Sequence, residues 1–157
     1  MSIRLSPHFT LAEMTHSQTA ARQGIDNSPT AAHQANLKQL CVELLEPIRS
    51  MLGNRPITVS SGYRSVALNA AVNGSLTSAH CIGFAVDFNC HSFGNAKAVA
   101  TFLAHELPKR GIQFDQLILE FGGWVHLGMF NRQMRQRGQI MTFRMINGKL
   151  DIKKGII

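Results

Sequence analysis

One short predicted strand that carries a carboxylate restricts the possible folds of this chain more than any other stretch. After Gly83 the side chains alternate between two faces, and three large apolar residues share one of them: Phe84, Val86 and Phe88. Asp87 lies on the other face, between Ala85 and Asn89. Burying a carboxylate is costly unless a cation compensates it, so Asp87 requires either a metal ion or an ion pair, for which Arg64 is a candidate.

The second candidate metal ligand is His80, in the run of mostly small residues before this strand. His80 and Asp87 are seven positions apart, so one uninterrupted strand would point their side chains to opposite faces. A bend between them is needed if both are to bind one ion. Gly83 can supply that bend, because glycine adopts backbone conformations that are closed to other residues.

A third ligand is suggested by residues 117–127, which form two predicted strands joined through a glycine pair. A three-residue loop over 121–123 would place Glu120 opposite Trp124, so that Glu120 and His126 face the same way. A two-residue loop would not. With the three-residue loop, His80, Asp87 and His126 supply a nitrogen, oxygen and nitrogen set that leaves the fourth position of a tetrahedral zinc ion to water. Glu120 could then accept a proton from that water, as a general base.

The expected helices follow from capping signals and apolar periodicity. The capping box Thr10-Leu11-Ala12-Glu13 predicts a short helix, Ser28-Pro29 begins the main one, Ser65 caps a helix over 66–72, and another covers about 96–107. The main helix carries a stripe with a 3.6-residue period: Leu37, Leu40, Cys41, Leu44, Leu45, Ile48 and Leu52. Pro47 should kink it or split it, and residues 15–27 are expected to be irregular.

The expected strands cover residues 56–61, 84–89, 114–121 and 124–129. A final hairpin should pair residues 141–146 with 150–153 through Asn147-Gly148, which is the strongest turn signal in the chain. With 157 residues, 45% of them hydrophobic, we expect a single domain over 1–157 with its own core. The three cysteines lack metal-binding spacing and are expected to be reduced thiols.

A formal charge of +7 predicts attraction to an anionic partner, with nucleic acid, a membrane surface and an acidic wall polymer as the candidates. The late cations include Arg132, Arg135 and Arg137, but no aromatic residues alternate with them as in single-strand binders. A nucleic-acid-binding domain is therefore supported by charge alone. The sequence begins without a signal-peptide pattern and has no run of 18 apolar residues, so we expect synthesis in the cytoplasm and no transmembrane segment.

Taken together, the motifs resemble the zinc D-Ala-D-Ala carboxypeptidase and phage endolysin family of peptidoglycan peptidases. The resemblance begins near Phe9-Thr10-Leu11 and covers most of the chain. It rests on these segments: Ser61-Gly62-Tyr63-Arg64, Asn69, Gly74-Ser75, Ser78 to Asp87 with His80, Gly83 and Ala85, and Glu120 with Trp124-Val125-His126.

The resemblance implies an α+β fold in which an antiparallel sheet carries the metal site and helices pack on it, as in the hedgehog signalling domain. It also implies that His80, Asp87 and His126 bind one zinc ion per chain, and that Glu120 is the general base. Several family members place the catalytic carboxylate three residues before the last histidine, where this chain has Gly123; Glu120 matches the arrangement of the hedgehog-like branch.

Each of the remaining site residues has two possible roles. Arg64 either pairs with Asp87 or contacts the substrate and the developing oxyanion, which is the role that the resemblance implies. Ser78 either binds substrate or orders the turn before His80, and Trp124 is either a substrate platform or a core residue.

The predicted function is hydrolysis of an amide bond in peptidoglycan stem peptides or cross-links, by a phage or prophage lysis enzyme that reaches the cell wall after release. The alternative is an inactive zinc-binding module that binds cell wall or a protein partner. The basic C-terminal segment is expected to contact anionic wall polymer or lipopolysaccharide. The sequence leaves open which bond is cut, and whether the enzyme is a carboxypeptidase or an endopeptidase.

Overall fold

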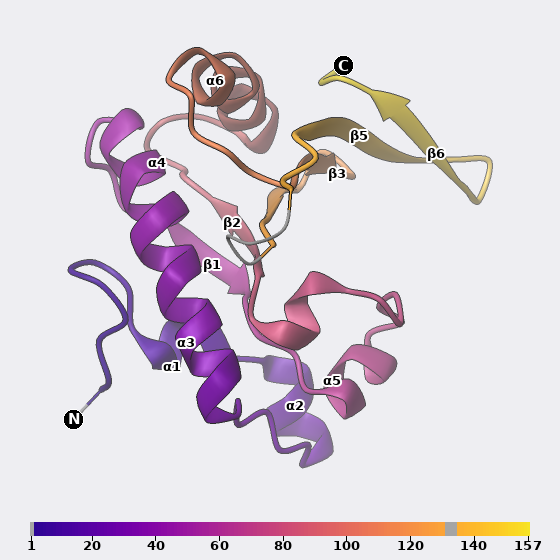
Figure 1. The fold of residues 1–157 in the computed structure, drawn as a ribbon. Helices are drawn as coiled ribbons and strands as arrows, with labels where there is room; N and C mark the ends of the chain where they lie inside the picture. The colour runs from indigo at the N-terminus through magenta and orange to yellow at the C-terminus, as the bar shows by residue number, and fades with distance from the viewer. Residues whose placement is uncertain (1, 131–134) are drawn as a thin grey trace.

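A computed structural model describes residues 2–130 and 135–157 of the chain. Within these residues, six strands form one sheet in the order β1-β2-β4-β3-β5-β6 (Figure 1). Neighbouring strands are antiparallel, except for β3 and β5, which are parallel. The strands are β1 (Thr58–Ser61), β2 (Ala85–Asn89), β3 (Gln116–Glu120), β4 (Trp124–Gly128), β5 (Gln139–Ile146) and β6 (Lys149–Lys154).

The helices pack around this sheet, which confirms the predicted α+β class with a largely antiparallel sheet. They are α1 (Leu11–Thr15), α2 (Gln18–Gln23), α3 (Ala31–Leu40), α4 (Glu46–Met51), α5 (Val66–Ala71) and α6 (Ala96–Lys109). Two further turns of helix are a π-helical segment, η1 (Cys41–Leu45), and a 3₁₀-helix, η2 (Ala79–Ile82). The part of the chain described by the structure contains no helix with the length and apolarity needed to cross a bilayer.

The main helix runs through α3, η1 and α4 along one side of the sheet (Figure 1). All seven residues of its predicted stripe are buried. The chain stays helical through Pro47 because the π-helical turn immediately precedes it; a wider turn gives the pyrrolidine ring room beside the preceding carbonyls. The core also includes Val99, Leu103 and Leu107 from α6, which packs against β3 and β4.

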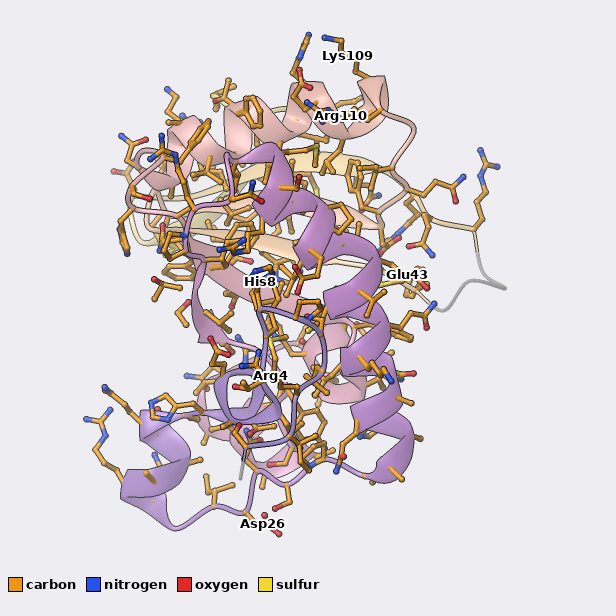
Figure 2. The ribbon with its side chains drawn as sticks, turned by 90° about the vertical axis from the view of Figure 1, so that its left-hand side faces the viewer. Arg4, His8, Asp26, Glu43, Lys109 and Arg110 are labelled. Carbon is orange, nitrogen blue, oxygen red and sulfur yellow. The ribbon has the colours of Figure 1, made fainter. Side chains whose placement is uncertain are left out.

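The N-terminal segment is tied to this main helix through Glu46. The Ser6 hydroxyl donates to the Glu46 carboxylate at 2.6 Å, and the backbone N–H of His8 donates to it at 2.8 Å. The His8 ring nitrogen Nδ1 lies 2.7 Å from the same carboxylate. Figure 2 shows His8 beside the main helix. The predicted capping box of α1 is present as well, since Thr10 and Glu13 bond reciprocally.

The expectation that residues 15–27 are irregular is wrong for residues 18–23. Residues Gln18–Gln23 form α2, which is capped by the Ser17 side chain and ended by Gly24 in the left-handed conformation. With six residues and one buried apolar side chain, Ala20, this helix is too short to show a periodic pattern. The predicted final hairpin is confirmed: β5 and β6 meet at Asn147 and Gly148, with φ values of 50° and 74°.

Candidate metal centre

Three elements bring the predicted ligands His80, Asp87 and His126 to one point. Asp87 on β2 and His126 on β4 are direct cross-strand partners, so their side chains leave the same face of the sheet. His80 is in η2, and Gly83 ends that helix with a φ of 81° before β2 begins. The bend therefore occurs at the residue expected from the spacing. The candidate ligand atoms of the three residues lie within 4.8 Å of one another.

Both histidines face the same oxygen of Asp87. His126 Nδ1 lies 2.8 Å from Asp87 Oδ1, and His80 Nε2 lies 3.2 Å from it. The three side chains are largely buried, with exposed fractions of 3% for His80, 7% for Asp87 and 11% for His126. The site is therefore a compact nitrogen, oxygen and nitrogen cluster shielded from most of the solvent.

The protonation state of His80 follows from its other ring nitrogen. Nδ1 lies 2.6 Å from the carbonyl oxygen of Gly62, which can only accept, so Nδ1 carries a proton. Burial lowers the pKa of His80, and this effect outweighs the opposing effect of Asp87. Nε2 is then an unprotonated, buried atom without a hydrogen-bond partner among the described residues, and its lone pair points at a carboxylate oxygen.

This arrangement fits a metal ion. Two electron-rich atoms facing each other at 3.2 Å repel unless a cation or proton lies between them. In metal sites a backbone carbonyl often accepts a hydrogen bond from the ring nitrogen of a histidine ligand that does not bind the metal, as Gly62 does from His80. This bond fixes the tautomer of the ligand. Two histidine nitrogens and one carboxylate form a donor set typical of catalytic zinc with an open coordination position. The predicted cofactor, one zinc ion per chain, agrees with this donor set.

Glu120 is placed on the same face by the β3–β4 connection. Glu120 pairs with Trp124 and Ile118 pairs with His126, which is the register of the three-residue loop. Glu120 Oε1 lies 3.7 Å from His126 Nδ1. Burial raises the pKa of Glu120, and the negative charge of Asp87 raises it further. A carboxylate with a raised proton affinity thus borders the cluster.

Arg64 pairs with the other oxygen of Asp87. Its Nη2 donates to Asp87 Oδ2 at 3.2 Å, while Nε donates to the Ser61 hydroxyl at 3.1 Å. The structure therefore shows Arg64 in the ion pair with Asp87. A contact of Arg64 with the substrate or the developing oxyanion stays a prediction.

Ser78 and the cysteines lie at the edge of the site. The Ser78 hydroxyl accepts the backbone N–H of His80 at 3.3 Å and caps η2, so it orders the turn before His80. Cys81 is half-buried and Cys90 is buried, and neither belongs to the cluster of candidate ligands in the described residues. All three cysteines are free thiols, as expected.

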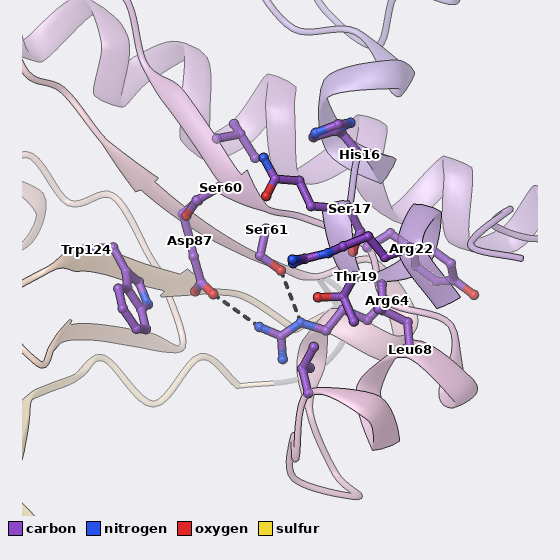
Figure 3. Close-up of a pocket in the computed structure, with 14 residues that line it drawn as sticks. His16, Ser17, Thr19, Arg22, Ser60, Ser61, Arg64, Leu68, Asp87 and Trp124 are labelled. Carbon is purple, nitrogen blue, oxygen red and sulfur yellow. Dashed lines mark hydrogen bonds and ion pairs between the residues drawn. The ribbon is translucent and has the colours of Figure 1, made fainter. Parts of the chain in front are cut away.

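A cleft of about 570 Å³ opens beside Asp87. Trp124 lies on one side of it, Arg64 and Asp87 lie in the middle, and α2 with Thr19 and Arg22 forms the other side (Figure 3). Trp124 thus borders the cleft rather than filling the core. The α2 wall was not predicted from the sequence, although Ser17 and Gly24 are signals of a capped helix.

Sequence comparisons agree with this geometry. Residues 7–128 match the family described as Peptidase M15. Over 87 residues the chain is 33% identical to a protein of Streptomyces albus G named zinc D-Ala-D-Ala carboxypeptidase. The matched region covers 55% of this chain and 33% of that relative, so the chain spans about a third of the relative's length.

Proposed function

Because the chain belongs to the Peptidase M15 family, we propose that it is a zinc peptidase that hydrolyses an amide bond in peptidoglycan peptides. One observation carries this proposal. His80, Asp87 and His126 converge within 4.8 Å, and the Glu120 carboxylate lies beside them on the same face of the sheet. A purely structural zinc site needs a fourth protein ligand and no neighbouring base. The name of the Streptomyces albus G relative supports both the metal and the substrate class.

His80, Asp87 and His126 would hold the ion. A bound zinc ion supplies a Lewis acid that polarises the scissile carbonyl and acidifies the attacking water. Gly62 keeps the proton of His80 on Nδ1, so Nε2 is free to coordinate. Arg64 occupies Asp87 Oδ2, which leaves Oδ1 directed toward the two histidines.

Glu120 is the proton carrier in this proposal. Its carboxylate accepts a proton from the attacking water and then donates that proton to the nitrogen of the leaving amine. The raised pKa of Glu120 favours proton uptake, since a base works best when its pKa approaches the operating pH. No covalent intermediate with the protein is needed.

Arg64 and Trp124 are the proposed substrate contacts, because both line the cleft beside Asp87. Arg64 retains guanidinium N–H groups that can reach a carbonyl or carboxylate oxygen of the peptide. Trp124 offers its ring as a wall of the cleft. Ser78 supports His80 and does not line the cleft, so we assign it a positioning role.

The narrower proposals concern where the enzyme acts. We propose that it acts on the cell wall as a phage or prophage lysis enzyme, and that basic residues of the C-terminal segment hold it near anionic wall polymer. Arg137 has a structural role, since it forms an ion pair with Asp115 at 2.7 Å, and Arg132 lies outside the described residues. Exposed Arg135, Lys149 and Lys154 are better residues for testing this contact. Unchanged binding of their triple glutamine variant to isolated sacculi at low salt would contradict it.

The decisive experiment for the proposed function is digestion of purified peptidoglycan by the zinc-loaded protein. Glu120→Ala and a chelated sample serve as controls, and product masses are measured. New amide-cleavage products from the wild type alone are expected, and their masses identify the bond and separate carboxypeptidase from endopeptidase activity. Tight zinc binding without any product would instead indicate an inactive zinc-binding module.

A further inference from the structure

The wall that α2 adds to the cleft contains an arginine with no role in the site described above. Arg22 is exposed, lines the cleft, and points into it opposite Trp124 (Figure 3). The described part of the chain offers Arg22 neither a hydrogen-bond acceptor nor a carboxylate partner. An arginine that faces a cleft without a protein partner is available to bind an anionic group from outside.

The wall is firmly attached to the metal centre. The side-chain amide of Asn27 donates to the backbone carbonyls of Thr15 and Tyr63, and its oxygen accepts the N–H of Ser65. The N–H of Tyr63 also donates to the carbonyl of Met14 at 2.7 Å. These bonds connect the residues on both sides of α2 to the segment that carries Arg64. Arg22 is therefore held at a fixed side of the cleft.

The charge of the cleft favours an anion at this position. Its lining contains two arginines, Arg22 and Arg64, and a single carboxylate, Asp87. Asp87 already bonds with Arg64 and with His126, so it leaves no negative charge for Arg22. A bound divalent ion would make the cleft still more positive.

We propose that Arg22 binds a free carboxylate of the substrate at a position removed from the scissile amide, so that the enzyme selects acidic peptides over their amidated forms. This inference rests on the proposed function and names the substrate class. Stem peptides offer two such groups, the α-carboxylate of D-glutamate and the C-terminal carboxylate. The guanidinium of Arg22 suits either, because its parallel N–H groups match a carboxylate in a bidentate geometry.

The test compares binding of three synthetic peptides of sequence L-Ala-γ-D-Glu-L-Lys-D-Ala-D-Ala, in which the side-chain carboxyl group of D-glutamate forms the peptide bond and its α-carboxylate is available. One peptide has both carboxylates free, the second has the D-glutamate α-carboxylate as an amide, and the third has the C-terminus as an amide. Trp124 is the single tryptophan of the chain and lines the cleft, so its fluorescence reports peptide binding. Binding is measured with the zinc-loaded Glu120→Gln protein, in which turnover is suppressed, and hydrolysis is measured separately with the active enzyme.

We expect the fully acidic peptide to bind on the order of 10-fold more tightly than one of the two amidated peptides, and the identity of that peptide locates the carboxylate. Arg22→Gln should weaken binding of the acidic form and bring this ratio close to 1, and Arg22→Lys should restore part of it. The matched control is Lys97→Gln, which removes the same charge from an exposed position on α6 and should keep the wild-type ratio.

Two results would overturn the inference. One is an unchanged ratio in Arg22→Gln, and the other is equal weakening of all three peptides, as expected if Arg22 only stabilises the end of α2. Failure of the proposed function gives a different pattern, in which the active enzyme cleaves no peptide while the Arg22-dependent preference persists in binding. If none of the three peptides binds, the acidic-peptide site itself is rejected.

Discussion

The carbonyl oxygen of Gly62 lies 2.6 Å from His80 Nδ1, and this contact connects the end of β1 to the candidate metal ligand. It fixes the proton of His80 on the side away from Asp87. Gly62 is itself fixed by the N-terminal segment, because a Cβ atom at this position would lie 2.3 Å from the carbonyl oxygen of Met14. The metal centre therefore depends on close backbone packing as well as on its ligands.

The first prediction concerns that packing. Gly62→Ala should lower the free energy of unfolding by about 1–3 kcal/mol, because backbone atoms must move to admit the methyl group. It should also weaken zinc binding by about 10- to 100-fold, because the carbonyl that orients His80 shifts. Denaturant unfolding and zinc titration measure the two effects. Gly123→Ala is the control, since its Cβ would meet only an ordinary contact at 3.8 Å.

The second prediction concerns the general base. Glu120→Gln preserves the shape of the side chain but removes its ability to take up a proton, so the rate of peptide hydrolysis should fall by about 10²- to 10⁴-fold. Zinc content and thermal stability should remain close to those of the wild type. Glu106→Gln on α6, whose carboxylate pairs with Arg110, is expected to keep full activity. A Glu120→Gln protein with near wild-type rates would reject this assignment.

The third prediction concerns metal removal. An ion bound by the folded state stabilises that state by mass action, by about 2.7 kcal/mol at a free concentration 100 times the dissociation constant. Chelation should therefore lower the melting temperature as well as abolish hydrolysis, and added zinc should restore both. In Asp87→Asn, which loses a charged ligand, calorimetry should find a much smaller difference between the zinc-loaded and chelated samples. An equal difference in both proteins would place the metal elsewhere.

The fourth prediction concerns pH and the N-terminal segment. Burial raises the pKa of Glu46, but hydrogen bonds from Ser6 and His8 outweigh this effect, and the net pKa lies below the usual 4.5. A carboxyl group with a lowered pKa in the folded state contributes stability above its unfolded pKa and loses it as the pH falls through the folded value.

Glu46→Gln should therefore be less stable than the wild type at pH 7, by about 1–3 kcal/mol for the lost charged hydrogen bonds. The difference should shrink as the pH falls below about 4.5 and the wild-type carboxylate becomes protonated. Urea unfolding at several pH values measures this trend. A difference that does not change with pH would mean that the Glu46 charge contributes nothing.

Local sequence signals determined much of the secondary structure and the chemical identity of the site. Alternation around Asp87, the stripe on the main helix, the capping box at Thr10 and the turn at Asn147 each depend on neighbours within a few residues. Such patterns report which face of one segment is buried. They also indicated the three-residue loop that places Glu120 and His126 on the same side, as one of two alternatives.

The tertiary structure alone decided how these segments meet. The order of strands sets β4 between β2 and β3, which makes Asp87 and His126 neighbours, and β5 adds in parallel to β3. The pairing of Arg64 with Asp87 and the placement of Arg22 across the cleft also depend on contacts between segments far apart in the sequence. Periodicity carries no information on these contacts, because they arise from packing between elements and not from preferences within one. The sequence by itself therefore determined the candidate ligands and base, whereas packing decided their geometry and the wall that faces them.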